Sequence, residues 1–184
     1  MAAFGTAEDL ASFLQLPTVD RYTAELLLDL ASDAIRDEVH QQIDQATTTE
    51  VYDGLPGDHP WAHVIFLRQV PVTAVSGVIS DGITLSATAY EWSAAGTIVR
   101  NIGVFSTSER GISVTYTHGW TAGTRELATV RGVCLQVAAR AYVNPMQVDR
   151  ITVGGISRDF ANSPRPGRLE LSEFEKRRLD PLRR

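Results

Sequence analysis

The feature that most constrains this chain is a change of hydrophobic period, from helical near both ends to strand-like in the middle. Residues 20–43 and 125–143 carry apolar side chains at three- and four-residue spacing, which is typical of amphipathic helices. Between them, residues of about 47–117 form short β-branched and aromatic runs separated by turn signals such as Asp81-Gly82 and Ala95-Gly96. We therefore predict an α+β fold in which two long packed helices flank an inserted antiparallel β-sheet of short strands.

Short helices are expected near both termini. Thr6 with Asp9, and Ser172 with Glu175, have the spacing of a capping box, which marks the first turn of a helix. The first pair predicts a helix over 7–15, and the second predicts a short helix after a linker over 162–168. We predict a core over 1–149, with helices 7–15, 20–43 and 125–143 and the β insertion, followed by a C-terminal docking arm over 150–184.

Charge is spread unevenly along the 184 residues. The net charge is −5, to which residues 1–60 contribute −10, residues 61–149 contribute +1 and residues 150–184 contribute +4. Such a chain can dock its acidic head on the basic tail of a copy of itself or of another partner, or the charges can simply be solvated. Overall acidity argues against a protein that reads nucleic-acid sequence, because those proteins usually carry a basic patch.

Motifs typical of catalysis are missing from the sequence. The chain has no GxSxG elbow, and its sole lysine, Lys176, belongs to no phosphate-binding loop. The sole cysteine, Cys134, lies on an apolar helical stripe and is expected to be a buried structural thiol. We expect no enzyme activity, no catalytic residue and no cofactor.

Two groups of residues could in principle hold a metal ion. His59 and His63 are four apart, but Pro60 and the preceding turn residues place His59 outside a helix. Acidic side chains at four-residue spacing, Asp29, Asp33 and Asp37, could bind a divalent ion, although a solvated helix face is the favoured interpretation. We therefore predict no metal site.

The C-terminal segment is not expected to form a compact core by itself, because Gly154-Gly155 and a linker rich in Pro, Gly and Arg interrupt it. Its apolar residues still need burial, either on a neighbouring subunit or on the chain's own helices. Candidates for a contact with a portal or a second subunit are the apolar and basic residues Ile151, Val153, Ile156, Arg158, Phe160, Leu171, Phe174, Arg177 and Arg178.

Several local patterns, and the order of the elements that contain them, resemble a known family. The most specific are Val114-Thr115-Tyr116-Thr117-His118-Gly119-Trp120, and Asn144-Pro145 followed by Val153-Gly154-Gly155-Ile156-Ser157. Near the N-terminus, Asp9-Leu10 and Phe13-Leu14 precede Ala24-Glu25-Leu26-Leu27-Leu28. Over most of its length the chain resembles the head–tail connector, or adaptor, proteins of tailed double-stranded DNA phages.

This resemblance implies a structural role in the virion. Such proteins form a ring, generally of twelve copies, beneath the portal, extend the DNA channel and present a platform for the next connector, stopper or tail protein. It implies a portal contact for the C-terminal segment, passage of DNA without sequence-specific binding, no membrane partner, and assembly in the host cytoplasm. A channel lining should not bind phosphates tightly, so the candidates for the channel wall are acidic: Asp29, Asp33, Asp37 and Glu38.

Two other classes of function remain open at this stage. A monomeric protein-binding module would use the β-sheet as its recognition face and have a compact tail. A metal-dependent hydrolase would use the N-terminal carboxylates and lose its activity in a chelator.

Overall fold

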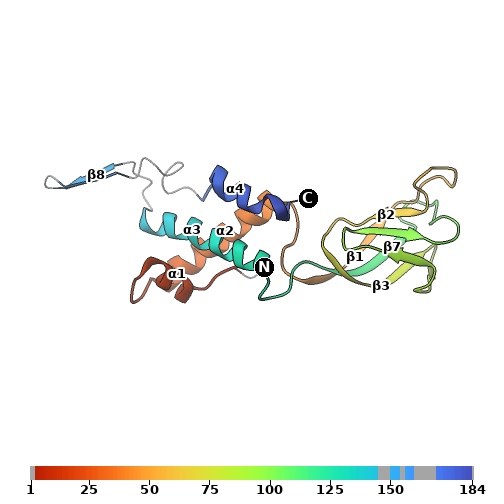
Figure 1. Ribbon diagram of the computed structural model, residues 1–184, viewed down its shortest axis with the longest axis horizontal. Helices are drawn as coiled ribbons and strands as arrows, with labels where there is room; N and C mark the ends of the chain where they lie inside the picture. The colour runs from red at the N-terminus through yellow and green to blue at the C-terminus, as the bar shows by residue number, and fades with distance from the viewer. Residues whose placement is uncertain (1–2, 145–149, 154–155, 160–168, 184) are drawn as a thin grey trace. The chain divides into compact units, whose positions relative to one another are not determined.

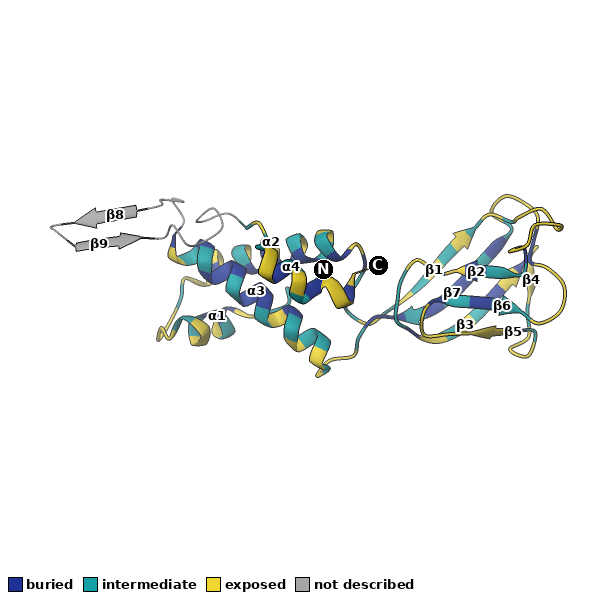
Figure 2. Cartoon of the chain, turned by 45° about the horizontal axis from the view of Figure 1, so that its top comes forward, coloured by how far each residue is buried: buried dark blue, intermediate teal, exposed yellow. Residues whose placement is uncertain are grey.

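The computed structural model describes residues 3–144, 150–153, 156–159 and 169–183, the side chains of 150–153 and 156–159 excepted. The chain forms two compact units, and one is inserted into the other. A helical unit contains the residues up to His40 and those from Gly123 onward, and a β unit contains Gln41–Ala122. Figure 1 labels the four α-helices of the first unit, and Figure 2 labels the strands of the second. The α+β class predicted from the change of period is confirmed.

The helical unit is built from four α-helices and one 3-10 turn. These are α1 (Ala7–Leu14), α2 (Arg21–Val39), α3 (Arg125–Val143), α4 (Glu173–Leu179) and η1 (Asp180–Leu182). The two long helices pack together as predicted, and each carries buried residues along its length (Figure 2). The core of this unit includes the apolar residues Leu10, Leu28, Ile35, Val133 and Val137, each at most 1% exposed.

Local chemistry explains where the helices start and stop. Thr6 Oγ1 accepts from the backbone N–H of Asp9 at 3.2 Å, and the Asp9 carboxylate accepts from the N–H of Thr6 at 3.0 Å, which is the capping box that the spacing predicted. The same reciprocal pair joins Ser172 and Glu175 at the start of α4. Helix α2 ends at Val39 and not at residue 43, because His40 takes a left-handed conformation with φ of 58°.

The β unit contains seven strands in two sheets, where the sequence predicted one. The strands are β1 (Ala46–Tyr52), β2 (Val64–Phe66), β3 (Val72–Ser80), β4 (Ile83–Thr84), β5 (Tyr90–Trp92), β6 (Thr97–Arg100) and β7 (Ile112–His118). One sheet has the order β1-β7-β3-β4 and the other β2-β6-β5, and all neighbouring strands are antiparallel. Both sheets contribute to one buried cluster, for example Ile98 from one and Val114 and Tyr116 from the other. The insertion thus has a core of its own.

Backbone hydrogen bonds join residues near the two ends of the β unit. The backbone N–H of Trp120 donates to the carbonyl of Ile43 at 2.9 Å, and the N–H of Gln45 donates to the carbonyl of Trp120 at 3.2 Å. Gly119, the residue before Trp120, has φ of +87°, and a Cβ there would lie 2.6 Å from the carbonyl oxygen of Asp44. The chain therefore enters and leaves this unit at one place.

Two further strands follow α3. Strands β8 (Arg150–Val153) and β9 (Ile156–Asp159) pair antiparallel as a hairpin, with Val153 opposite Ile156. Within the described residues they form a two-stranded sheet with each other. The boundary between the core over 1–149 and the arm over 150–184 stays a prediction, since 145–149 are outside the described residues.

Candidate assembly surfaces of the helical unit

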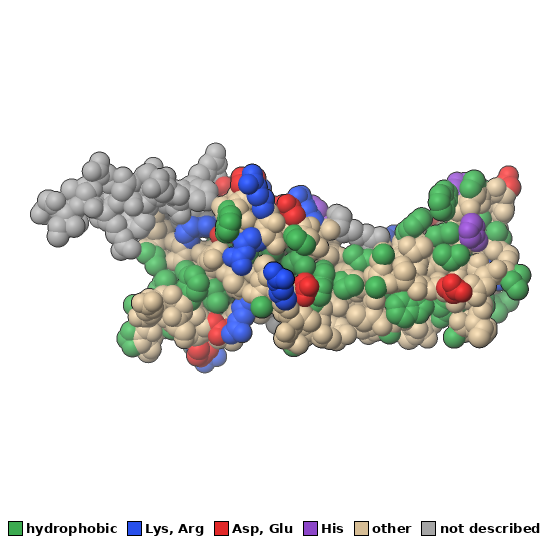
Figure 3. Space-filling view, in the orientation of Figure 1, with side chains coloured by type: hydrophobic (Ala, Val, Ile, Leu, Met, Phe, Trp, Pro, Cys, Tyr) green, Lys and Arg blue, Asp and Glu red, His purple; other side chains and the backbone are tan. Residues whose placement is uncertain are grey.

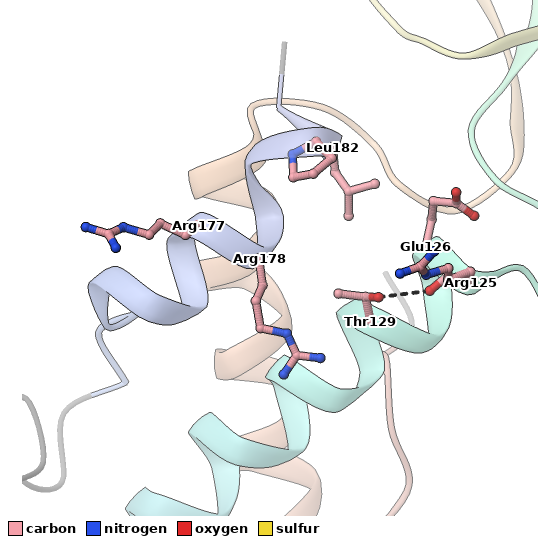
Figure 4. A pocket seen from close by; sticks show the side chains of 7 residues that line it. Arg125, Glu126, Thr129, Arg177, Arg178 and Leu182 are labelled. Carbon is pink, nitrogen blue, oxygen red and sulfur yellow. Dashed lines mark hydrogen bonds between the residues drawn. The ribbon is translucent and has the colours of Figure 1, made fainter.

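A pocket lies between the start of α3 and the end of α4. We call it the arginine pocket; its volume is about 480 Å³, and it is lined by Arg125, Glu126, Thr129, Arg177, Arg178, Pro181 and Leu182. In Figure 4, Arg178 extends from α4 toward α3. Thr129 Oγ1 donates to the backbone carbonyl of Arg125 at 3.0 Å, which fixes its side chain in the first turns of α3. The pocket thus combines the guanidinium groups of Arg125 and Arg178 with an apolar wall from η1, while the Arg177 side chain extends away from α3 (Figure 4).

The arginine pocket carries positive charge that the described residues do not neutralise. Arg125, Arg177 and Arg178 form no ion pair with any described carboxylate, and the Arg178 guanidinium lies 5.9 Å from the ring centre of Phe174. The Thr124 hydroxyl at the N-cap of α3 makes no capping bond, so the partial positive charge of this helix end adds to theirs. Basic side chains over α3 and α4 are visible in Figure 3. This pocket can accept an anionic group.

Helix α4 is held in place by a buried ion pair. Arg140 Nη1 lies 2.8 Å from Glu175 Oε1, and Arg140 Nη2 donates to the carbonyl of Glu170 at 3.0 Å. Glu175 is only 3% exposed. Weaker contacts join Glu38 of α2 to Lys176 at 3.7 Å and to Arg183 at 3.3 Å. Helix α4 therefore packs on the chain's own helices. Of the two possibilities left open by the sequence, this part of the arm follows the second, burial on its own chain and not on a neighbouring subunit.

The outward face of α2 is the second notable surface. We use this name for Tyr22, Leu26, Asp29, Leu30, Asp33 and Asp37, which lie opposite the buried stripe of the helix and are all exposed. Tyr22 is 85% exposed and Leu26 is 59% exposed. Large apolar side chains exposed together on one helix face indicate a surface that can meet a partner.

The structure brings some of the predicted residues together and separates others. Arg177 and Arg178 line the arginine pocket, Phe174 is 66% exposed beside it, and Leu171 is half-buried. Of the other candidates, Ile151, Val153, Ile156 and Arg158 lie on the β8–β9 backbone, and their side chains, like Phe160, are outside the described residues.

The acidic candidates for the channel wall differ among themselves. Asp29, Asp33 and Asp37 are exposed on the outward face of α2, and Asp33 lies 3.1 Å from Arg36. Glu38 is half-buried and is already paired with Lys176 and Arg183. A place in the wall of a channel stays a prediction for all four.

Sequence reasoning missed Arg125 and the exposed apolar residues of α2. A signal for Arg125 exists: it is the first residue of α3, where a positive charge opposes the helix dipole and is unexpected without another role. Leu26 and Leu30 fall off the buried stripe of their helix, which is the pattern of a second apolar contact.

Histidine, cysteine and carboxylate side chains in the described ranges do not converge on a possible metal site. No group of three or more His, Cys, Asp or Glu side chains there could hold a metal ion. His59 Nδ1 accepts a hydrogen bond from the N–H of Trp61 at 3.2 Å, within its own turn. Burial raises the pKa of the Cys134 thiol, which lies 3.4 Å from Ser32 Oγ in the helical core. Among the described helices, none is long and apolar enough to cross a membrane.

Comparison with solved structures finds the same fold in chains of gene transfer agent particles. No protein-family model matches the sequence, and no curated protein is significantly similar to it. A chain in the virion of the native gene transfer agent particle aligns with a TM-score of 0.52 and 14% identity, over 71% of this chain and 75% of that one. A chain in the neck of the empty gene transfer agent particle, computed with C6 symmetry, aligns with a TM-score of 0.50 and 15% identity over the same shares. The chain therefore shares its fold with a chain of each of these two particles. This agrees with the resemblance to head–tail connectors.

Proposed function

We propose that this chain is a structural protein of the head–tail junction. It assembles as a closed ring of identical copies, on the order of a dozen, that joins the portal to the next connector, stopper or tail protein and extends the DNA channel without catalysing a reaction. The fold it shares with a chain from a neck of C6 symmetry is the observation that carries this proposal. It would be present in the host cytoplasm during assembly and in the virion afterwards.

Two features of the helical unit support assembly into a ring. A closed ring uses two different patches on each copy, and patches of opposite charge help to set the register between copies. The helical unit carries one basic surface, the arginine pocket, and one acidic surface, the outward face of α2. Among the described residues, the arginines of the pocket and the aspartates of this helix face form no ion pair other than the contact between Asp33 and Arg36.

The β8–β9 hairpin is the part of the C-terminal segment best suited to dock on a portal. Helix α4 already packs on the helical unit through the Arg140–Glu175 ion pair, so we do not assign the portal contact to it. An isolated two-stranded hairpin is only marginally stable in water, so a partner that covers or extends it would stabilise it. We therefore place the portal contact at residues 150–159, with passing DNA held by no specific contact.

Native mass spectrometry over a range of concentrations, with negative-stain images of the same samples, tests the ring. The expected result is a closed ring of many copies, alone or after addition of portal. Deleting residues 150–159 should leave ring formation intact and abolish attachment to portal. A chain that stays monomeric at every concentration and does not bind portal would contradict the proposal and favour a monomeric binding module.

A further inference from the structure

The arginine pocket suits an anionic partner, because its arginines form no ion pair with a described carboxylate. Arg125 and Arg178 face the pocket without a carboxylate in ion-pairing distance, whereas nearby Arg140, Lys176 and Arg183 are each paired. Glu126 is the one acidic residue in the lining. Pro181 and Leu182 add an apolar wall, so the shape and chemistry suit a carboxylate carried on a partly apolar surface.

The outward face of α2 has the complementary chemistry. Asp29 and Asp37 are exposed and form no ion pair with any described residue. Leu26 and Leu30, on the same face, are 59% and 42% exposed. A helix face of this kind can place a carboxylate on an arginine while its leucines cover an apolar wall.

We propose that, in the ring of the proposed function, the arginine pocket of one copy receives the outward face of α2 from the next copy. The pocket is lined by α3, α4 and η1, and the outward face of α2 lies opposite the stripe that α2 packs inside its own unit. The two surfaces are therefore different patches, and a contact between them is heterologous. Repeating such a contact builds a closed ring when the rotation closes.

Protein carboxylates suit this pocket better than DNA phosphates do. Contacts with the DNA backbone usually need an extended basic surface that neutralises many phosphates, and the chain as a whole has a net charge of −5. An apolar wall contributes nothing to a phosphate contact, whereas it can bury leucines of a second copy. Assigning Asp29 and Asp37 to this contact competes with their predicted place in the channel wall.

Charge reversal on full-length chains tests the proposal. One variant reverses the pocket (Arg125→Glu with Arg178→Glu), and the other reverses the helix face (Asp29→Arg with Asp37→Arg). Each alone should raise the concentration needed for assembly by about tenfold or more, because like charges then meet. A mixture of the two variants in equal amounts should assemble again, with the two variants alternating around the ring, because opposite charges then meet at every contact. A single chain with all four changes should also assemble, for the same reason.

The mixing result separates docking from misfolding, since a misfolded variant cannot rescue its partner. The matched control reverses two exposed arginines of the β unit (Arg68→Glu with Arg110→Glu) and should assemble like the wild type. If both reversed variants assemble normally, this contact is wrong while the ring stands. Assembly without change, combined with loss of binding to a double-stranded oligonucleotide in the pocket variant, would make the pocket a DNA site instead.

Disulfide trapping gives an independent measurement when assembly is weak. A chain with Leu26→Cys and Arg178→Cys should form a ladder of linked copies on mild oxidation, since Cys134 has zero exposure and does not compete. Each single replacement should give dimers at most. A wild type without any assembly and a double variant without a ladder would overturn both the ring and this contact.

Discussion

Single residues in the sequence run that resembles connector proteins serve the fold of the β unit. His118 is completely buried, and its Nε2 is 2.9 Å from Thr48 Oγ1 on the neighbouring strand. Gly119 follows in a left-handed conformation that brings the backbone against Asp44, where any larger side chain would clash. Residues Val114–Trp120 thus stabilise the β unit by joining its last strand to residues near its start. His118 has no role in the proposed assembly.

Burial of His118 predicts a pH-dependent stability of the β unit. Desolvation lowers the pKa of His118 below its ordinary 6.5, an effect that the charge of Glu50 partly opposes. Below about pH 6.5, the His118 imidazole therefore binds a proton more readily in the unfolded chain than in the folded chain. The free energy of unfolding should be undiminished by this group above about pH 6.5 and should fall as the pH drops below it.

Urea unfolding followed by tryptophan fluorescence at about pH 7.5 and 5.5 measures this dependence. The variant His118→Gln keeps a polar group near Thr48 but cannot titrate, so its unfolding free energy should lose part of the pH dependence. His40→Gln, at an exposed histidine, is the matched control and should behave as the wild type does. An unchanged pH dependence in His118→Gln would show that this histidine does not limit stability in acid.

At the scale of elements, the buried Arg140–Glu175 ion pair is a main contact that holds α4 on the helical unit. Breaking a buried pair by removing one partner costs about 3–5 kcal/mol, because the remaining charge is left without compensation. Arg140→Ala should therefore detach α4 from the helical unit, and limited proteolysis should then cut the chain before Glu173 much faster than in the wild type. Lys176→Ala removes only a partly exposed contact and should change the cleavage rate little.

A second variant guards against general unfolding as the explanation. Arg140→Met with Glu175→Leu replaces both charges by apolar groups and should restore protection of α4, as buried pairs often tolerate this exchange. If Arg140→Ala leaves the C-terminal segment as resistant as before, the contacts of Leu179 and Leu182 suffice to hold it. Circular dichroism should show that the other helices remain in every variant.

Local patterns predicted the elements well and their long-range arrangement poorly. Capping residues identified the starts of α1 and α4, and turn signals separated the strands nearly as observed. The end of α2 was missed because Ile43 continues the helical spacing, although its burial belongs to the β unit. The arginine pocket could not be predicted either, since it arises only when η1 and α4 pack beside the first turn of α3.

At the scale of the whole molecule, the proposed assembly surfaces and the β unit are separable. Every residue of the arginine pocket and of the outward face of α2 belongs to the helical unit. The β unit has its own buried cluster, and its ends are joined by the hydrogen bond from Trp120 to Ile43. A domain with its own core and adjacent ends can often be removed or transplanted without loss of its fold.

Excision should therefore give two folded proteins. Residues 41–122 alone should unfold cooperatively and keep the strand content of the intact chain, as judged by circular dichroism and a denaturant titration. The complementary chain, with His40 joined to Gly123 by a short Gly/Ser linker, should keep its helices and still assemble, because both surfaces of the proposed contact remain. A helical chain that folds but no longer assembles would show that the β unit supplies a subunit contact, and a β unit that does not fold alone would show that its core depends on the helices.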